Sequence, residues 1–107
     1  MTDDPCADDY APPEFPDGAL VRDFPIINRK GLHARATAKF VQCAEKYDAD
    51  IMVARCGEIV GGTSIMAILT LGAGMGSTIT VAAKGPQADE ALDALEALVA
   101  DKFGEDE

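Results

Sequence analysis

The segment that most restricts the possible folds is "DADIMVARCGEIVGG", residues 48–62, because it predicts a β-hairpin. Two short apolar runs flank a tight turn near Cys56 and Gly57, which is the pattern of two strands joined by a short loop. Ile51 and Val53 have the spacing expected of residues on the buried side. Since a hairpin pairs its strands antiparallel, the sheet of this protein is not all-parallel.

Two further segments have patterns expected of strands. In "STITVAAKG", residues 77–85, three apolar side chains fall on one face: Ile79, Val81 and Ala83. In "ALVRDFPII", residues 19–27, the residues of one parity that we expect to face the core are Leu20, Phe24 and Ile26. Pro25 has no backbone N–H to donate, so it places this strand at the edge of the sheet.

Three segments have the features of helices. After Gly31, apolar residues recur at helical spacing and predict a helix over roughly residues 33–47. The apolar segment "TSIMAILTLG", residues 63–72, predicts a short second helix with Thr63 or Ser64 as its cap and Gly72 as its stop. Residues 86–103 predict a third helix, with acidic residues in its first turn and an apolar stripe of Leu92, Leu95, Leu98, Val99 and Phe103.

The elements therefore follow the order β-α-β-β-α-β-α. The chain of 107 residues is long enough for one compact domain and too short for two ordinary ones, and no segment repeats. A paired hairpin together with helices favours one four-stranded antiparallel sheet with three helices on one face. We therefore predict the α+β class, in the form of an open-faced β-sandwich.

Acidic residues are concentrated at the N-terminus. The net charge is −10, and residues 1–18 contribute six acidic side chains and no basic one. This segment is also rich in proline, and such a composition buries too little apolar surface to offset the cost of ordering. We therefore expect a disordered extension over residues 1–18, a domain over residues 19–103 and an acidic C-terminal tail over residues 104–107.

The remaining composition restricts the setting of the protein. The chain lacks the basic start and apolar run of a secretory signal, and no stretch approaches membrane-spanning length, so we expect a cytoplasmic protein that does not bind membranes. An acidic domain with scattered lysines also lacks the basic face that nucleic-acid binding needs. Cys6, Cys43 and Cys56 are widely spaced and form no CxxC pair, which predicts free thiols and argues against a zinc site.

The only histidine, His33, lies in "NRKGLHARATAKF", residues 28–40, between a glycine turn and the start of the first predicted helix. The first amides of a helix lack partners and the helix dipole is positive there, which binds anions and disfavours protonation of a nearby imidazole. A neutral imidazole is a nucleophile. Arg35 can bring a guanidinium to an anion at the same amides. Together these groups could receive a phosphoryl group.

Each candidate residue also has a simpler explanation. A lone histidine at a helix start is compatible with a loop or capping role, and Arg35 with a solvated surface charge. Ser64 is compatible with a plain helix cap. Ile65, Met66 and Leu69 would usually belong to a core, although a two-turn helix can bury only part of so apolar a surface, and the remainder could be a docking patch.

Two stretches in the right order and spacing carry a resemblance. "GLHARATA", followed after the predicted hairpin by "GGTSIMAILTLGAGMG", resembles the signature regions of the HPr family of phosphocarrier proteins, and the match runs from about residue 19 to residue 103. The resemblance implies that His33 accepts a phosphoryl group on Nδ1 from the phosphohistidine of enzyme I, itself charged by phosphoenolpyruvate. It also implies donation to an EIIA-type protein, in sugar uptake or in a regulatory, nitrogen-related branch. Such a protein is a carrier and not an enzyme.

The resemblance assigns roles to further residues. Arg35 corresponds to the arginine that steadies the phosphoryl group. Ser64 corresponds to a regulatory serine, which in many bacteria is phosphorylated by an ATP-dependent HPr kinase/phosphorylase. The apolar patch on which partners dock corresponds to Ile65, Met66 and Leu69. We expect a monomer that needs no cofactor or metal.

Two positions depart from the family pattern. Ala36 stands where proline commonly follows the arginine, and alanine, a good helix former, leaves the helix start viable. Thr63 stands where a basic or amide-bearing residue often precedes the regulatory serine, which weakens Ser64 as a kinase target. A second hypothesis therefore stays open, in which the protein is a regulatory adaptor controlled by phosphorylation of Ser64, with little carrier activity.

Overall fold

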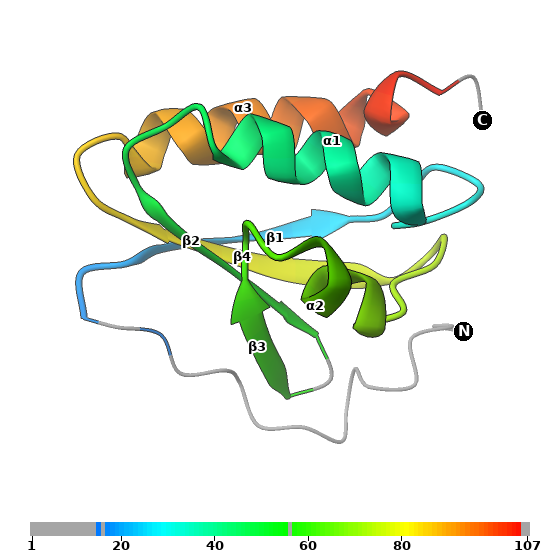
Figure 1. Ribbon diagram of the computed structural model, residues 1–107, viewed down its shortest axis with the longest axis horizontal. Helices are drawn as coiled ribbons and strands as arrows, with labels where there is room; N and C mark the ends of the chain where they lie inside the picture. Colours follow the sequence, from blue (N-terminus) through cyan, green and yellow to red (C-terminus); the bar gives the residue numbers. More distant parts are fainter. Residues whose placement is uncertain (1–14, 16, 56, 106–107) are drawn as a thin grey trace.

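The computed structural model describes residues 15, 17–55 and 57–105, which form one four-stranded sheet with helices packed on one face (Figure 1). In chain order the elements are β1 (Leu20–Pro25), α1 (Ala34–Ala44), β2 (Asp50–Arg55), β3 (Glu58–Gly61), α2 (Ile65–Thr70), β4 (Thr78–Lys84), α3 (Ala88–Ala100) and the 3-10 helix η1 (Lys102–Gly104). This order confirms the predicted β-α-β-β-α-β-α pattern and the α+β class.

The strands follow the order β1-β4-β2-β3, and every neighbouring pair is antiparallel. The predicted hairpin is formed by β2 and β3, with Arg55 opposite Glu58 beside the turn. Ile51 and Val53 are buried, as the hairpin pattern predicts. β1 lies at an edge of the sheet, which confirms the inference from Pro25.

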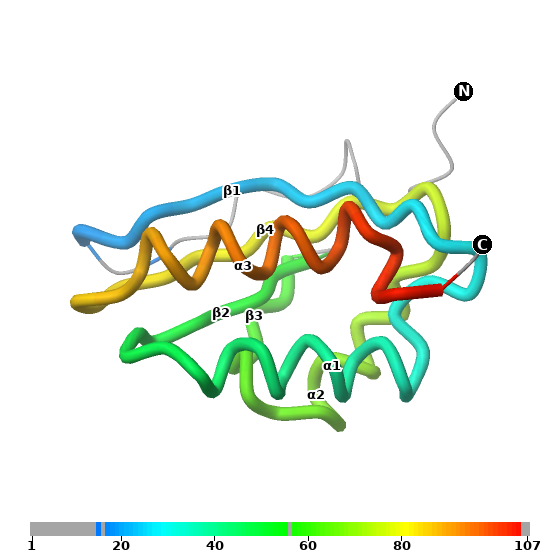
Figure 2. The backbone as a smooth tube through the Cα atoms, turned by 90° about the horizontal axis from the view of Figure 1, so that it is seen from above, coloured from blue at the N-terminus to red at the C-terminus, as the bar shows by residue number. Residues whose placement is uncertain are grey.

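The core lies between the sheet and the helices. Figure 2 shows α3 running along β1 and β4, and α1 lies beside α3 on the same face of the sheet. The predicted inner residues of β4 are all buried, and they meet fully buried side chains from the other elements: Phe24, Phe40, Ile68, Leu92, Leu95 and Phe103. Removing this continuous apolar surface from water is the main favourable contribution to folding.

One predicted core residue of β1 is not buried. Leu20 is 44% exposed, whereas Phe24 and Ile26 are each 1% exposed. The next residue of the same parity, Arg22, forms ion pairs with carboxylates of α3. The side of α3 that faces Arg22 therefore carries carboxylates, and Leu20, at the start of this edge strand, stays largely exposed.

Two helices are shorter than their predicted ranges. α1 begins at Ala34, with His33 as its N-cap, and ends at Ala44 instead of near Tyr47. α3 ends at Ala100, so the prediction that the helix continues to Phe103 is wrong, although Phe103 is fully buried. Phe103 has a positive φ of 57°, which no α-helix contains, and it enters the core from the turn of η1.

Most of the expected disordered extension falls outside the described residues, because residues 1–14 and 16 are not described. Phe15 is half-buried, and a turn over residues 17–18 leads into β1. Cys43 is a free thiol, as predicted, whereas Cys6 and Cys56 lie outside the described residues. No helix among the described residues is long and apolar enough to span a membrane.

Candidate functional site

The backbone before α1 is fixed by a close approach of two loops. Gly31 has a φ of 66°, and a Cβ atom at this position would lie 2.5 Å from the carbonyl oxygen of Ala73. The amide of Leu32 donates to the same oxygen at 2.8 Å. Glycine is therefore required here both by its backbone conformation and by the lack of space. The contact fixes the direction in which the chain enters α1.

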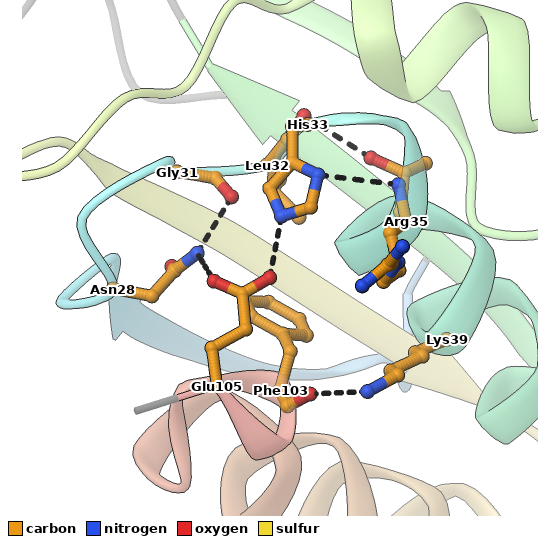
Figure 3. A network of polar contacts seen from close by, with 9 residues as sticks. Asn28, Gly31, Leu32, His33, Arg35, Lys39, Phe103 and Glu105 are labelled. Atoms are coloured by element: carbon orange, nitrogen blue, oxygen red, sulfur yellow. Dashed lines mark hydrogen bonds and ion pairs between the residues drawn. The ribbon is translucent and has the colours of Figure 1, made fainter. Parts of the chain in front are cut away.

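His33 caps α1 with its own side chain. Its backbone is extended, its carbonyl accepts from the amide of Thr37 at 2.9 Å, and its Nδ1 accepts from the amide of Arg35 at 3.3 Å (Figure 3). The side chain is 27% exposed. Nδ1 thus lies among the first amides of a helix, where the peptide dipoles favour negative charge.

The other ring nitrogen of His33 contacts a residue for which we predicted no role in the site. Nε2 lies 2.5 Å from Oε2 of Glu105, a residue that we assigned to the acidic C-terminal tail. Because a carboxylate only accepts, Nε2 carries the proton and donates, while Nδ1 accepts from Arg35 and keeps its lone pair. The two contacts therefore select one tautomer of the neutral ring.

Two further side chains hold Glu105 and its segment in place. Asn28 is completely buried, and its Nδ2 donates to Oε1 of Glu105 at 3.0 Å and to the carbonyl of Gly31 at 2.8 Å. Lys39, one turn along α1, donates from Nζ to the carbonyl of Phe103 at 2.6 Å. Figure 3 shows both contacts on the side of His33 that faces the C-terminal segment.

The electrostatics of Glu105 follow from these contacts. The hydrogen bond with His33 lowers the pKa of this carboxyl, and the hydrogen bond from Asn28 and the nearby charge of Lys30 act in the same direction. Burial opposes the shift without reversing it. Glu105 is therefore ionised at neutral pH and presents a negative charge to the Nε2 side of the ring.

Arg35 lies beside His33 in the first turn of α1 (Figure 3), and its side chain is exposed. The structure therefore brings together the two candidate residues at this helix start, where Nδ1 of His33 contacts the first helix amides. An anion bound there would meet backbone donors and a guanidinium within reach.

The remaining predicted site residues lie at the start of α2 and, for Leu69, near its end. Ser64 is the N-cap of this six-residue helix, but its side chain makes no capping hydrogen bond, and it is exposed. Ile65 and Met66 are 39% and 72% exposed, and Leu69 is half-buried. Ile68, which is fully buried, anchors the helix. The expectation that these three apolar residues are partly uncovered agrees with their burial.

α2 lies alongside the N-terminal half of α1 in both Figure 1 and Figure 2, and the two helices pack against each other. The exposed side chains of Ile65 and Met66 are therefore on an element next to the one that carries His33. One partner surface that covered the start of α1 could contact both.

A family model described as "PTS HPr component phosphorylation site" matches residues 20–101 of this chain. The chain belongs to the HPr family. This confirms the resemblance drawn from the two signature stretches, and it makes the protein a phosphocarrier of the phosphotransferase system.

Individual relatives agree with this assignment. Phosphocarrier protein HPr of Cupriavidus necator is 49% identical over 88 residues, which cover 82% of this chain and 99% of the relative. Phosphocarrier protein NPr of Shewanella violacea is 44% identical over 86 residues, which cover 80% of this chain and 94% of the relative. The crystal structure of HPr-C-His from Thermoanaerobacter tengcongensis has a TM-score of 0.79 at 39% identity, covering 82% of this chain and 99% of that one. The open-faced sandwich is thus the fold of a solved HPr.

Proposed function

We propose that this HPr protein accepts a phosphoryl group on Nδ1 of His33 from phosphorylated enzyme I and passes it to an EIIA-type protein. The observation that carries the proposal is the asymmetry of the ring: Nε2 donates to Glu105, while Nδ1 keeps a lone pair among the first amides of α1. Nδ1 is therefore the nitrogen available for nucleophilic attack.

The transfer balances without a cofactor. The Nδ1 lone pair attacks the phosphorus of the phosphohistidine on enzyme I, the old P–N bond breaks, and its electron pair returns to the imidazole of enzyme I. The ring of His33 becomes cationic while Nε2 retains its proton, and Glu105 faces that charge. Delivery to the acceptor reverses these steps. Phosphoryl transfer depends mainly on positioning and on stabilising charge, so a shallow site completed by a partner is sufficient.

Arg35 and the α1 amides supply that stabilisation in our proposal. The phosphoryl oxygens carry the negative charge, and backbone N–H groups at a helix start are suited to bind them. The guanidinium of Arg35 is exposed at the first turn and can close over the same oxygens.

The docking surface in this proposal comprises Ile65, Met66 and Leu69. A partner that buries Ile65 and Met66 gains from removing apolar surface from water, and the adjoining start of α1 then comes within its reach. We propose that enzyme I and the EIIA-type acceptor use this surface in turn, each with one monomer of the carrier. We place the reaction in the cytoplasm, in keeping with the expectation from the composition of the sequence.

A second candidate function is favoured by the state of Ser64. Its side chain is exposed and makes no capping hydrogen bond, so a kinase such as HPr kinase/phosphorylase could reach it without first breaking a cap. A regulatory adaptor that responds to phosphorylation of Ser64 would use the same α2 surface and would need little chemistry at His33.

Incubation with enzyme I and phosphoenolpyruvate separates the two. A carrier gains an acid-labile, base-stable phosphate, as expected of phosphohistidine, and His33→Ala does not gain it. The adaptor alternative predicts no such phosphate and an acid-stable phosphate on Ser64, formed only with ATP and a kinase. Glu45→Gln, a change at an exposed residue at the far end of α1, is the matched control and should be phosphorylated as the wild type is.

A further inference from the structure

We propose that residues 103–105 form a C-terminal clasp in which Glu105 is a positioning residue that decides which nitrogen of His33 receives the phosphoryl group. The inference rests on the proposed carrier function and adds to it a residue, a tautomer and a consequence for transfer.

Both carboxylate oxygens of Glu105 are engaged, and by different residues. Oε2 contacts Nε2 of His33, and Oε1 accepts from the buried Asn28. Asn28 in turn is held by the carbonyl of Gly31, two residues before His33. The carboxylate therefore has one orientation relative to the ring, which a solvated tail residue would not have.

The backbone in the clasp and just before it adopts a conformation that Lys102 and Phe103 disfavour. Lys102, Phe103 and Gly104 have φ values of 55°, 57° and 77°. For residues with a Cβ atom, and for an aromatic residue above all, this left-handed conformation is unfavourable and persists only where the surroundings hold it. Here the fully buried Phe103 ring and the hydrogen bond from Lys39 hold it, and the result is to bring Glu105 back to His33.

The charge of the clasp suits the phosphorylated ring as well as the free one. With the phosphoryl group on Nδ1 and the proton on Nε2, the ring is cationic, and the Glu105 carboxylate faces the N–H. When the P–N bond breaks toward the acceptor, the electron pair returns to Nδ1 and a neutral imidazole leaves. Without the proton on Nε2 the leaving group would be an imidazolate anion, which is much poorer. Glu105 therefore favours delivery as well as acceptance.

The test uses the full chain labelled with 15N in its histidine. In the wild type near neutral pH, the ring nitrogen shifts should report the tautomer with the proton on Nε2. In Glu105→Ala both tautomers should be populated, and transfer of the phosphoryl group to an EIIA-type protein should slow by roughly ten-fold. Glu105→Asp, which restores the carboxylate on a shorter side chain, should recover part of both effects, and Glu45→Gln should alter neither.

The possible failures are distinguishable because the tautomer is measured without any phosphoryl transfer. An unchanged tautomer in a folded Glu105→Ala variant overturns the clasp, and so does a changed tautomer with an unchanged transfer rate. If the wild type accepts no phosphate from enzyme I, the carrier function fails instead. Lys39→Met provides a second variant, since it releases the Phe103 carbonyl and leaves Glu105 intact. It should shift the tautomer in the same direction by a smaller amount.

Discussion

The starts of α1 and α2 are two exposed or partly exposed helix N-termini with different surroundings. At α1 the capping residue, His33, bonds the helix through Nδ1 and a distant carboxylate through Nε2. At α2 the capping residue, Ser64, makes no side-chain cap and stands exposed beside Ile65 and Met66. The contrast indicates that a reactive position needs contacts that fix its atoms, whereas a docking position needs only accessible apolar surface. We therefore expect changes at the start of α1 to affect phosphoryl transfer, and changes at the start of α2 to affect partner binding.

The largest effect is expected at the start of α1. His33→Ala should abolish phosphate acceptance completely, because no other group replaces Nδ1, while the domain stays folded because the side chain is partly exposed and lies outside the core cluster. Phosphorylation by enzyme I, with a thermal melt of the same sample, measures both. A folded variant that still gains acid-labile phosphate would place the reaction elsewhere.

A smaller loss is expected from Arg35→Ala. The backbone amides of α1 remain to bind the phosphoryl oxygens, so transfer from enzyme I should slow by roughly ten-fold and not stop. Single-turnover kinetics with phosphorylated enzyme I provide the rate. A rate equal to that of the wild type would reduce Arg35 to a solvated charge and leave the amides as the only anion-binding groups at this start.

At the start of α2 the expected effect is on binding. Ser64→Asp adds a charge beside Ile65 and Met66, so a partner that covers them must desolvate it, and the apparent KM for enzyme I should rise several-fold with a smaller change in the maximal rate. Stability should stay near normal, because a negative charge suits a helix N-terminus. Identical saturation curves for the two proteins would leave Ser64 a plain cap, and a loss of stability would mean that its hydroxyl supports the fold.

The clasp should also be visible in a titration. The pKa of Glu105 is lowered by His33 first and Asn28 second, so the ionised clasp stabilises the fold fully above the ordinary glutamate pKa. This contribution is lost as the pH falls through the lower, folded value. Carboxyl 13C shifts should show Glu105 titrating below the ordinary glutamate pKa, and His33→Ala should move its midpoint upward. A wild-type midpoint of Glu105 at the ordinary glutamate value would remove the electrostatic basis of the clasp.

The smallest effect is expected from the acidic extension. We propose that it is disordered, and deletion of residues 1–14 should leave the melting temperature and phosphate acceptance nearly unchanged, since a segment of this composition contributes few contacts. A retained Phe15 keeps the half-buried side chain in place. A loss of several degrees on deletion would show that the extension packs on the domain.

Patterns that are local in sequence predicted most of the fold. The hairpin around Gly57, the alternation of β4 and the edge position of β1 all follow from the spacing of apolar residues and from Pro25. The prediction that Leu20 faces the core is wrong because burial depends on which helix residues cover the strand. The neighbouring side of α3 carries the carboxylates that pair with Arg22. The spacing of apolar residues within one element does not show which residues of another element pack against it.

The sequence predicted the candidate site residues that are close together in the chain and missed the distant one. His33 and Arg35 lie two residues apart at one helix start, so a short motif is enough to find them. Glu105 lies 72 residues from His33, and it reaches the ring through left-handed residues that sequence patterns would assign to the end of a helix. The only sequence signal was Gly104 between a buried aromatic residue and an acid, which permits a turn without indicating where it leads.

Whether the protein carries a phosphoryl group between two partners can be measured in the second half of the cycle, the transfer to the acceptor. Phosphorylated protein, freed of enzyme I and phosphoenolpyruvate, is mixed with an EIIA-type protein, and the phosphate on each chain is followed with time. Our account predicts that phosphate leaves His33 and appears on the acceptor in equal amount. Phosphate that stays on His33, or is released only as inorganic phosphate at the same rate with and without the acceptor, would contradict it.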